Sequence, residues 1–274
     1  MAVLQEKTGF NNQSIIAGNC AQRALVHSLL LLGIPISVKK AHQKTGITFL
    51  KAMIHGTSEK ELKRGIRRCR CFPFEHTFDE WKASKGHIDE YLDSGMPVII
   101  AINDRKHWMV LSGRAGEDSY YWVDSSDGDL YGSDSAREVR NWMDCEGEFY
   151  FIAVKPEDDS QLDRSVVTVF DQVYECFDDD DIAEYWGVYL EDVSDAFDSP
   201  KDTTDAISAG EFFDRYEKMF VDTIVHYYGD LEKADVAYEM GNYRAVAECH
   251  RMSVSKDRLP LAIMKITAAV ALLF

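Results

Sequence analysis

Residues 18–33 read GNCAQRALVHSLLLLG, and this stretch predicts the first clear helix of the chain. The following Gly33-Ile34-Pro35 is typical of a helix end, because glycine adopts the cap conformation and proline cannot continue a helix. The Cys20 thiol is therefore expected at a helix N-terminus. Small and apolar residues recur behind it at the three- and four-residue spacing of a buried helix face, at Ala21, Ala24, Leu25, Ser28, Leu29 and Leu32.

Further helical signals follow this first helix. Residues 38–55 are expected to be helical, although their pattern is less regular. Ser58 is expected to cap another helix that runs through Arg68, because Glu61 stands three residues later, at the position that completes a capping box.

The pattern then changes from helical to extended. Residues 96–102 are a continuous apolar run of strand length, which is typical of a central strand. Residues 107–113 and 119–124 flank a glycine-containing turn and predict an antiparallel hairpin, and residues 148–154 predict one more strand. Helices first and strands afterwards indicate the α+β class rather than the βαβ alternation of a doubly wound fold.

Charge divides the chain into two regions. The 274 residues include 30 Lys+Arg and 47 Asp+Glu, a net charge of -17. Residues 1–160 hold 20 basic and 23 acidic residues, a net of -3, whereas residues 161–274 hold 10 and 24, a net of -14. With a polar linker at residues 155–163, we expect two domains, residues 1–157 and residues 164–274. The second is expected to be acidic and helical, with helices over residues 182–196, 208–228 and 231–249.

Composition also limits which binding partners and which cellular compartment we expect. So large an acidic surplus repels phosphate backbones and anionic lipids, so nucleic acid and membranes are not expected partners. The acidic second domain instead favours a basic protein partner. Residues 259–274 are apolar, but sixteen residues interrupted by Lys265 are too short to span a bilayer, so we expect a buried terminal helix. Six scattered cysteines without a secretory leader indicate a cytoplasmic protein.

Three residues could form a catalytic triad. A helix N-terminus stabilises a thiolate, so Cys20 is a candidate nucleophile. His107 begins the first strand of the predicted hairpin and Asp124 ends the second, so both side chains are expected at the same end of the sheet. A histidine that accepts the thiol proton and is oriented by a carboxylate completes the arrangement. Among nearby amides, Gln13 is our choice for binding the oxyanion together with the Cys20 N–H.

Taken singly, each residue has a structural explanation: a buried thiol, a packed histidine and a turn aspartate. Their joint occurrence in this order, each on its expected element, favours a site.

These residues carry a resemblance that covers a little over half of the chain. The N-terminal ~155 residues resemble the papain-like cysteine peptidases, and within them the bacteriocin-leader-peptidase-like branch, which cleaves after double-glycine leaders. Two departures are visible, since Ala21 stands where that family has glycine and the spacing from Gln13 to Cys20 is one residue longer. The matching segments are Gln13, Cys20 with its apolar helix, Gly56-Thr57-Ser58, His107-Trp108-Met109-Val110 and Tyr121-Trp122-Val123-Asp124-Ser125.

The resemblance implies a papain-like fold and a cysteine peptidase that cleaves a peptide or isopeptide bond without a cofactor or metal. Cys20 would be the nucleophile, His107 the base, Asp124 the orienting group and Gln13 the oxyanion ligand. Two alternatives stay open. The same residues serve an acyltransferase or deamidase of the effector type, and an inactive papain-like scaffold could act as a protein-binding module.

Other clusters are weaker candidates. Cys69 and Cys71 are separated by one residue, which is tighter than the usual spacing of structural zinc ligands. The basic residues between Lys63 and Arg70 are better explained as a solvated helix face than as a nucleic-acid site. The four acidic residues at positions 178–181 lack the alternating oxygen ligands of a calcium loop and predict a solvated acidic segment.

Overall fold

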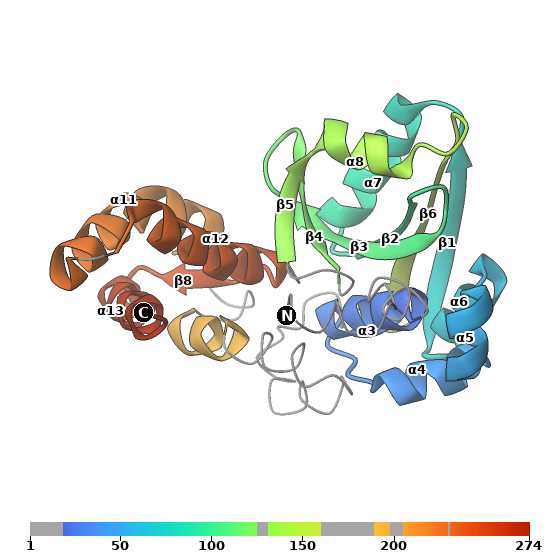
Figure 1. The fold of residues 1–274 in the computed structure, drawn as a ribbon, viewed down its shortest axis with the longest axis horizontal. Coiled ribbons are helices and arrows are strands. Elements are labelled where there is room, and N and C mark those ends of the chain that lie inside the picture. The colour runs from blue at the N-terminus through green and yellow to red at the C-terminus, as the bar shows by residue number, and fades with distance from the viewer. Residues whose placement is uncertain (1–18, 125–130, 160–188, 198–204, 230) are drawn as a thin grey trace, which may run out of the picture.

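The computed structural model describes residues 19–124, 131–159, 189–197, 205–229 and 231–274. Its centre is a six-stranded antiparallel sheet in the order β1-β6-β2-β3-β4-β5 (Figure 1). Helices pack on both sides of it, so the expected α+β class is confirmed. The strands are β1 (Cys71–Phe78), β2 (Val98–Ile102), β3 (His107–Arg114), β4 (Ser119–Val123), β5 (Tyr131–Ser135) and β6 (Phe149–Pro156).

Neighbouring residues of a strand point to opposite faces of the sheet, so each face has its own helices. On one face, Ile100 shares a core with α7 (Trp81–Asp93) and α8 (Ala136–Met143). On the other face, Ile99 shares a core with α3 (Cys20–Leu31). Figure 1 shows α3 across the sheet from α7 and α8.

The N-terminal helices follow the sequence signals closely. α3 begins at Cys20 and ends before Gly33, which adopts a φ of 69°. The expected helical stretch at residues 38–55 is two helices, α4 (Val38–Thr45) and α5 (Phe49–His55), because the chain turns through left-handed backbone at Gly46. The expected capping box opens α6 (Glu59–Arg68).

The expected order of helices before strands is wrong. β1 precedes β2 in the chain with α7 between them, and α8 lies between β5 and β6. β1 is an edge strand that contains Pro73, which suits an edge because proline donates no ladder hydrogen bond. Edge strands alternate weakly between polar and apolar residues here, so periodicity did not reveal β1 or β5.

The described part of the C-terminal half is mainly helical, as predicted. The expected helices at residues 208–228 and 231–249 are α11 (Ala209–Tyr228) and α12 (Lys233–Cys249). Residues 189–196 are helical, and the earlier part of that predicted helix lies outside the described residues. A two-stranded ribbon of β7 (Ala206–Ser208) and β8 (Ser253–Ser255) was not predicted.

The C-terminal half shares the core of the sheet. α12 packs against β3, β4 and β5 on the same face as α3. One continuous apolar cluster joins Leu25 of α3, Tyr121 of β4 and Val246 of α12. The two-domain division stays a prediction, since the linker lies partly outside the described residues, but the two halves bury apolar surface against each other.

The terminal helix α13 (Leu259–Leu272) exists as expected, but the expectation that it is buried is wrong for its outer face. Ala262 and Ile266 are fully buried, whereas Met264 is 61% exposed and Leu272 is 85% exposed. One side of the helix packs into the core and the other remains apolar at the surface. Within the described ranges, no helix combines the length and the apolar character needed to cross a membrane.

Candidate active site

α3 presents the Cys20 thiol from its first residue. Asn19 is the N-cap residue, but its side chain does not cap the helix; instead its Oδ1 lies 3.1 Å from Nε2 of His42 on α4. The first N–H groups of a helix have no partner within the helix, so they point past Cys20 with the positive end of the helix dipole. Cys20 itself is 5% exposed, so negative charge at this point is largely shielded from water.

The hairpin places His107 and Asp124 together. His107 is the first residue of β3 and Asp124 directly follows β4, so antiparallel pairing brings both to one end of the sheet. His107 Nε2 lies 2.9 Å from both oxygens of the Asp124 carboxylate. Cys20 lies near the same ring, close enough to contribute to the raised pKa of His107. Since Nε2 faces Asp124, Nδ1 is the ring nitrogen left for the thiol.

The charge state of His107 follows from its two neighbours. Burial alone would lower the pKa of His107, but hydrogen bonds to Asp124 and Cys20, together with the charges of those two groups, raise it to about 10. The imidazole is therefore protonated at neutral pH.

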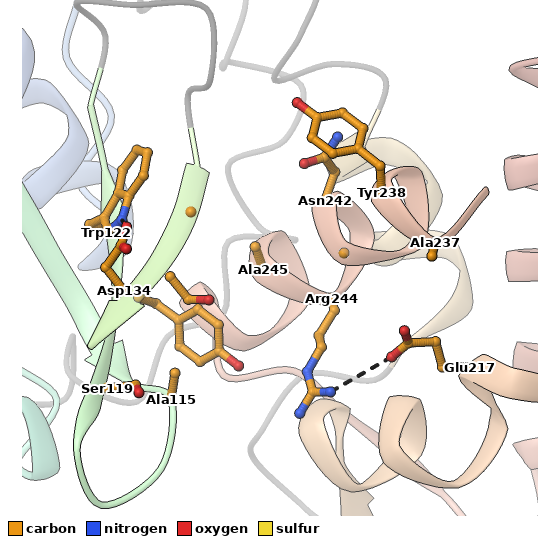
Figure 2. A pocket seen from close by; sticks show the side chains of 14 residues that line it. Ala115, Ser119, Trp122, Asp134, Glu217, Ala237, Tyr238, Asn242, Arg244 and Ala245 are labelled. Carbon is orange, nitrogen blue, oxygen red and sulfur yellow. Dashed lines mark hydrogen bonds and ion pairs between the residues drawn. The ribbon is translucent and has the colours of Figure 1, made fainter. Parts of the chain in front are cut away.

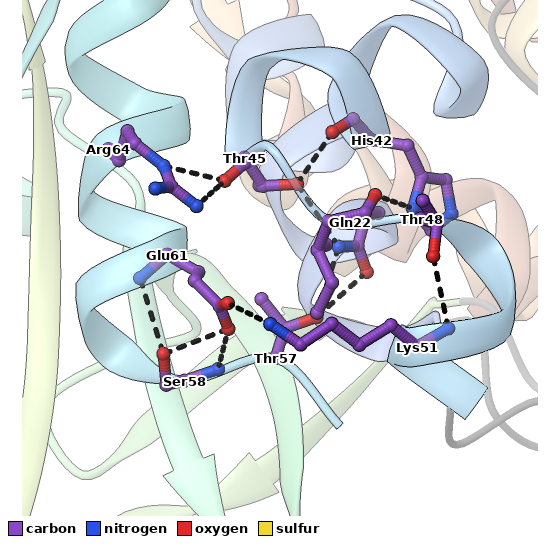
Figure 3. A network of polar contacts seen from close by, with 10 residues as sticks. Gln22, His42, Thr45, Thr48, Lys51, Thr57, Ser58, Glu61 and Arg64 are labelled. Atoms are coloured by element: carbon purple, nitrogen blue, oxygen red, sulfur yellow. Dashed lines mark hydrogen bonds and ion pairs between the residues drawn. The ribbon is translucent and has the colours of Figure 1, made fainter. Parts of the chain in front are cut away.

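A buried polar network fixes α3 against its neighbours (Figure 3). The Gln22 amide, two residues after Cys20, donates to the hydroxyls of Thr45 at 3.3 Å and Thr57 at 3.0 Å. The Thr57 carbonyl in turn accepts the indole N–H of Trp108 at 3.3 Å. Trp108 adjoins His107, so this chain of bonds connects the helix that carries the thiol to the strand that carries the base.

The outer part of this network holds the helices around α3 in place. Ser58 and Glu61 form the capping box of α6, and Lys51 on α5 pairs with Glu61 at 3.2 Å. Arg64 on α6 donates through Nε to the Thr45 carbonyl at 2.7 Å, close to the end of α4. Through these bonds the Gly-Thr-Ser start of α6, which is far from Cys20 in the sequence, helps to hold the helix that carries Cys20.

The turn before His107 was not identified from the sequence. Asn103, Asp104 and Arg105 have φ values of 53°, 56° and 60°, a left-handed run that residues other than glycine rarely adopt. The Arg105 guanidinium pairs with Glu148 at 2.7 Å and lies 5.2 Å from the ring centre of Tyr150. These contacts hold the strained turn against β6 and its neighbouring loop. They therefore set the point at which β3 begins with His107.

A cleft of about 630 Å³ lies between the β4–β5 hairpin and α12 (Figure 2). Trp122 and Asp134 line it from the hairpin, and Arg244 lines it from α12, where Glu217 of α11 lies 3.8 Å from the guanidinium. Trp122 precedes Asp124 by two residues. Both halves of the chain therefore form a concave surface on the strand that leads to the triad.

The weaker candidate sites receive structural explanations. Cys71 is buried, and burial raises the pKa of its thiol to about 12, so it stays protonated. Among the residues that the structure describes, no group of three or more metal-binding side chains occurs. In the basic cluster, Lys63 pairs with Glu75 and Arg68 donates to the carbonyl of Lys44. The acidic run at positions 178–181 lies outside the described residues.

Three of the four expected site residues, Cys20, His107 and Asp124, come together in the fold. The fourth, Gln13, lies outside the described residues. Comparisons with models of protein families, with curated proteins and with solved structures found no match. The chemistry of these side chains is therefore the basis for a function.

Proposed function

We propose that this chain is a papain-like cysteine peptidase that cleaves a peptide or isopeptide bond through Cys20, His107 and Asp124. The observation that supports the proposal is a buried imidazole 2.9 Å from a carboxylate and near a thiol, an environment that raises the pKa of His107 to about 10. An imidazolium beside a thiol at a helix N-terminus is the arrangement that acyl transfer through sulfur requires.

In the acylation step, the Cys20 thiolate attacks the carbonyl carbon of the substrate and a C–S bond forms. The carbonyl oxygen takes up negative charge next to the N–H groups at the start of α3, where Gln13 would add a side-chain amide. His107 then transfers its proton to the leaving nitrogen as the C–N bond breaks. Asp124 keeps the ring oriented throughout.

In the deacylation step, His107 is neutral and accepts a proton from a water molecule. The resulting hydroxide attacks the thioester carbon, the C–S bond breaks, and the carboxylic acid leaves. Cys20 returns as a thiolate and His107 as an imidazolium, so the starting state is restored.

Limited alkylation tests this proposal because the described thiols differ in exposure. Cys145 is partly exposed, whereas Cys20 is buried, so accessibility alone favours labelling of Cys145. Activation by His107 favours Cys20. We expect substoichiometric iodoacetamide at pH 7 to modify Cys20 first, as located by peptide mass analysis.

Matched variants complete the experiment. Cys20→Ala should abolish the fast labelling phase, and Cys145→Ala should leave it unchanged. Peptide mixtures should then give cleavage products with the wild-type chain and none with Cys20→Ala. First labelling at Cys145, or a Cys20 that reacts no faster than a free thiol, would overturn the proposal. Products that gain an added amine instead of water would replace hydrolysis with acyl transfer.

A further inference from the structure

The cleft between the hairpin and α12 lies beside an edge strand of the sheet. β5 is the last strand in the sheet order, and within the part of the chain that the structure describes it pairs with β4 alone. The N–H of Ala136 donates to the Asp118 carbonyl at 2.7 Å, which fixes the alternation of the ladder. Gly132 and Asp134 then bond to β4, and the backbone N–H and C=O groups of Ser133 point away from it. These outward groups can pair with one further strand.

The cleft has room beside this edge because a glycine stands on each of its walls (Figure 2). A Cβ added at Gly241 of α12 would meet no atom within 4 Å, so the space next to this glycine is open. On the hairpin, a Cβ added at Gly132 would lie 2.2 Å from the Trp122 ring. The indole therefore lies against the backbone of β5, and its N–H donates to Asp134 at 2.9 Å.

The charges of the cleft favour a basic ligand. Among the described residues that line it, Asp134 and Glu217 are acidic and Arg244 is basic. The Arg244 guanidinium pairs with Asp214 at 2.8 Å and with Glu248 at 3.3 Å. It also lies 3.8 Å from Glu217. Three carboxylates thus offset its positive charge, so the field within the cleft is negative.

The same edge leads to the triad. Tyr131, the first residue of β5, pairs with Val123, which directly precedes Asp124. His107 begins β3 at this end of the sheet. Two strand spacings, or about 10 Å, separate β5 from β3, and about three residues of extended chain cover that distance. A peptide that lies along β5 can therefore continue to the triad.

We propose that this cleft binds the substrate as an extended peptide, which pairs with the outer edge of β5 and places basic side chains beside Asp134 and Glu217. The inference rests on the proposed function of the triad and adds its substrate class, a basic and extended polypeptide segment. Backbone pairing supplies affinity in strand addition, and alternate side chains supply selectivity. Because α12 forms one wall of the cleft, the C-terminal half takes part in substrate recognition.

Direct binding tests the inference in the full-length Cys20→Ala chain, which cannot cleave the probe. The probe is a short fluorescein-labelled peptide in which lysine alternates with threonine or valine, and fluorescence anisotropy measures its affinity. One control peptide carries glutamate in place of lysine, and another is N-methylated at alternate backbone nitrogens. We expect each control to bind about tenfold more weakly, since the first reverses the charge and the second removes the donors that pair with β5.

A variant that fills the cleft gives a second measurement. Gly241→Leu places a side chain in the open space of α12, and leucine is a better helix former than glycine, so the variant should fold. We expect it to weaken binding of the basic peptide about tenfold or more. Gly86→Leu on α7 is the matched control, because a Cβ added there also meets no atom within 4 Å. It should leave the affinity unchanged.

The outcomes separate the inference from the proposed function. The inference is wrong if the basic peptide does not bind, if the N-methylated peptide binds equally well, or if Gly241→Leu binds like the Cys20→Ala parent. Cleavage of peptides by the wild-type chain that Gly241→Leu does not slow would also overturn it, while the proposed function stands. If the peptide binds as expected but Cys20 is inert in the wild-type chain, the proposed function fails and the peptide site remains.

Discussion

Two pairs of a cysteine and a histidine, Cys20 with His107 and Cys249 with His250, lie on the same face of the sheet. They differ in the charge of the histidine rather than in the exposure of the cysteine. Cys20 is 5% exposed and Cys249 is 3% exposed. Cys20 stands at the N-terminal end of α3 beside the His107 imidazolium. Cys249 is the last residue of α12. Burial raises its thiol pKa to about 12; the hydrogen bond from Ser112 opposes this shift, and the charge of Glu248 adds to it. A helix places positive charge at one end and negative charge at the other, so the two thiols receive opposite fields.

The histidines show the same contrast. His107 has its pKa raised to about 10, whereas His27 and His250 have theirs lowered to about 3. All three are buried, so burial does not distinguish them. His107 Nε2 lies 2.9 Å from both oxygens of the Asp124 carboxylate. The partner of a buried group, more than its residue type, decides whether it is ionised.

Removing the base should have the largest effect on the difference in reactivity between Cys20 and Cys249. We expect His107→Gln to slow alkylation of Cys20 at pH 7 about 100-fold, because only a thiolate reacts with iodoacetamide and it loses its imidazolium partner. Stopped alkylation followed by mass analysis measures the rate. His76→Gln, on β1, is the matched control and should react like the wild type. Equal rates for His107→Gln and the wild type would remove the basis for treating the two thiols differently.

Replacing the Asp124 carboxylate by a neutral amide should have a smaller effect on the alkylation rate of Cys20 and a large effect on the pKa of His107. With Asp124→Asn, burial is no longer opposed by the negative charge, so the pKa of His107 should fall from about 10. Alkylation of Cys20 should slow about 10- to 100-fold, since the ring keeps its place but loses its ionic partner. Histidine NMR between pH 5 and 11 gives the titration. A His107 that still titrates near its wild-type value would show that Asp124 is not the cause of the shift.

The neutral histidines should make the fold sensitive to acid. Their folded pKa values of about 3 lie below the unfolded value of 6.5, so the unfolded chain binds the extra protons. Their contribution to stability is complete above pH 6.5 and is lost as the pH falls toward 3. At pH 5.5 each imidazole should reduce the free energy of unfolding by roughly 1.4 kcal/mol.

Urea unfolding from pH 7 to pH 4.5 measures this loss. His107 has the opposite sign, because its raised pKa contributes stability below pH 6.5 that is lost only as the pH rises through about 10. It therefore adds little slope below about pH 5.5. His250→Gln should reduce the slope of the free energy of unfolding against pH in the acid range. The reduction should correspond to about one bound proton relative to the wild type. An identical slope in both proteins would mean that His250 is protonated in the folded chain.

Sequence patterns predicted the triad residues better than they predicted the two buried neutral histidines, His27 and His250. Cys20 is recognisable because a glycine-asparagine break precedes a long apolar helix, and His107 and Asp124 because they bound the strands of a hairpin. His27 lies inside the same apolar helix and resembles one polar residue among many. Its pKa depends on burial and on groups such as His250, which is more than 200 residues away in the chain. The packing of α12 on β3, β4 and β5 brings these distant segments into one core.

The order of elements was mispredicted for a related reason. β1 and β5 are edge strands of five to eight residues with mixed polarity, and α7 lacks a strong apolar stripe. Elements of this kind depend on tertiary contacts that a local pattern does not contain. The central strands, which are buried on both faces, were evident from their continuous apolar runs.

The mildest change separates the stability of the interface from the chemistry of the site. Ser112→Ala removes the hydroxyl that donates to the Cys249 sulfur at 2.8 Å, a bond that lies entirely within the interior. Loss of one such bond should lower the free energy of unfolding by about 1 kcal/mol, measured by urea unfolding at pH 7. Cys249 should stay unlabelled in the folded chain, because its thiol remains buried and protonated, and the alkylation rate of Cys20 should not change. A faster reaction at Cys249 would show that the hydroxyl, rather than burial and the end of α12, keeps this second thiol inert.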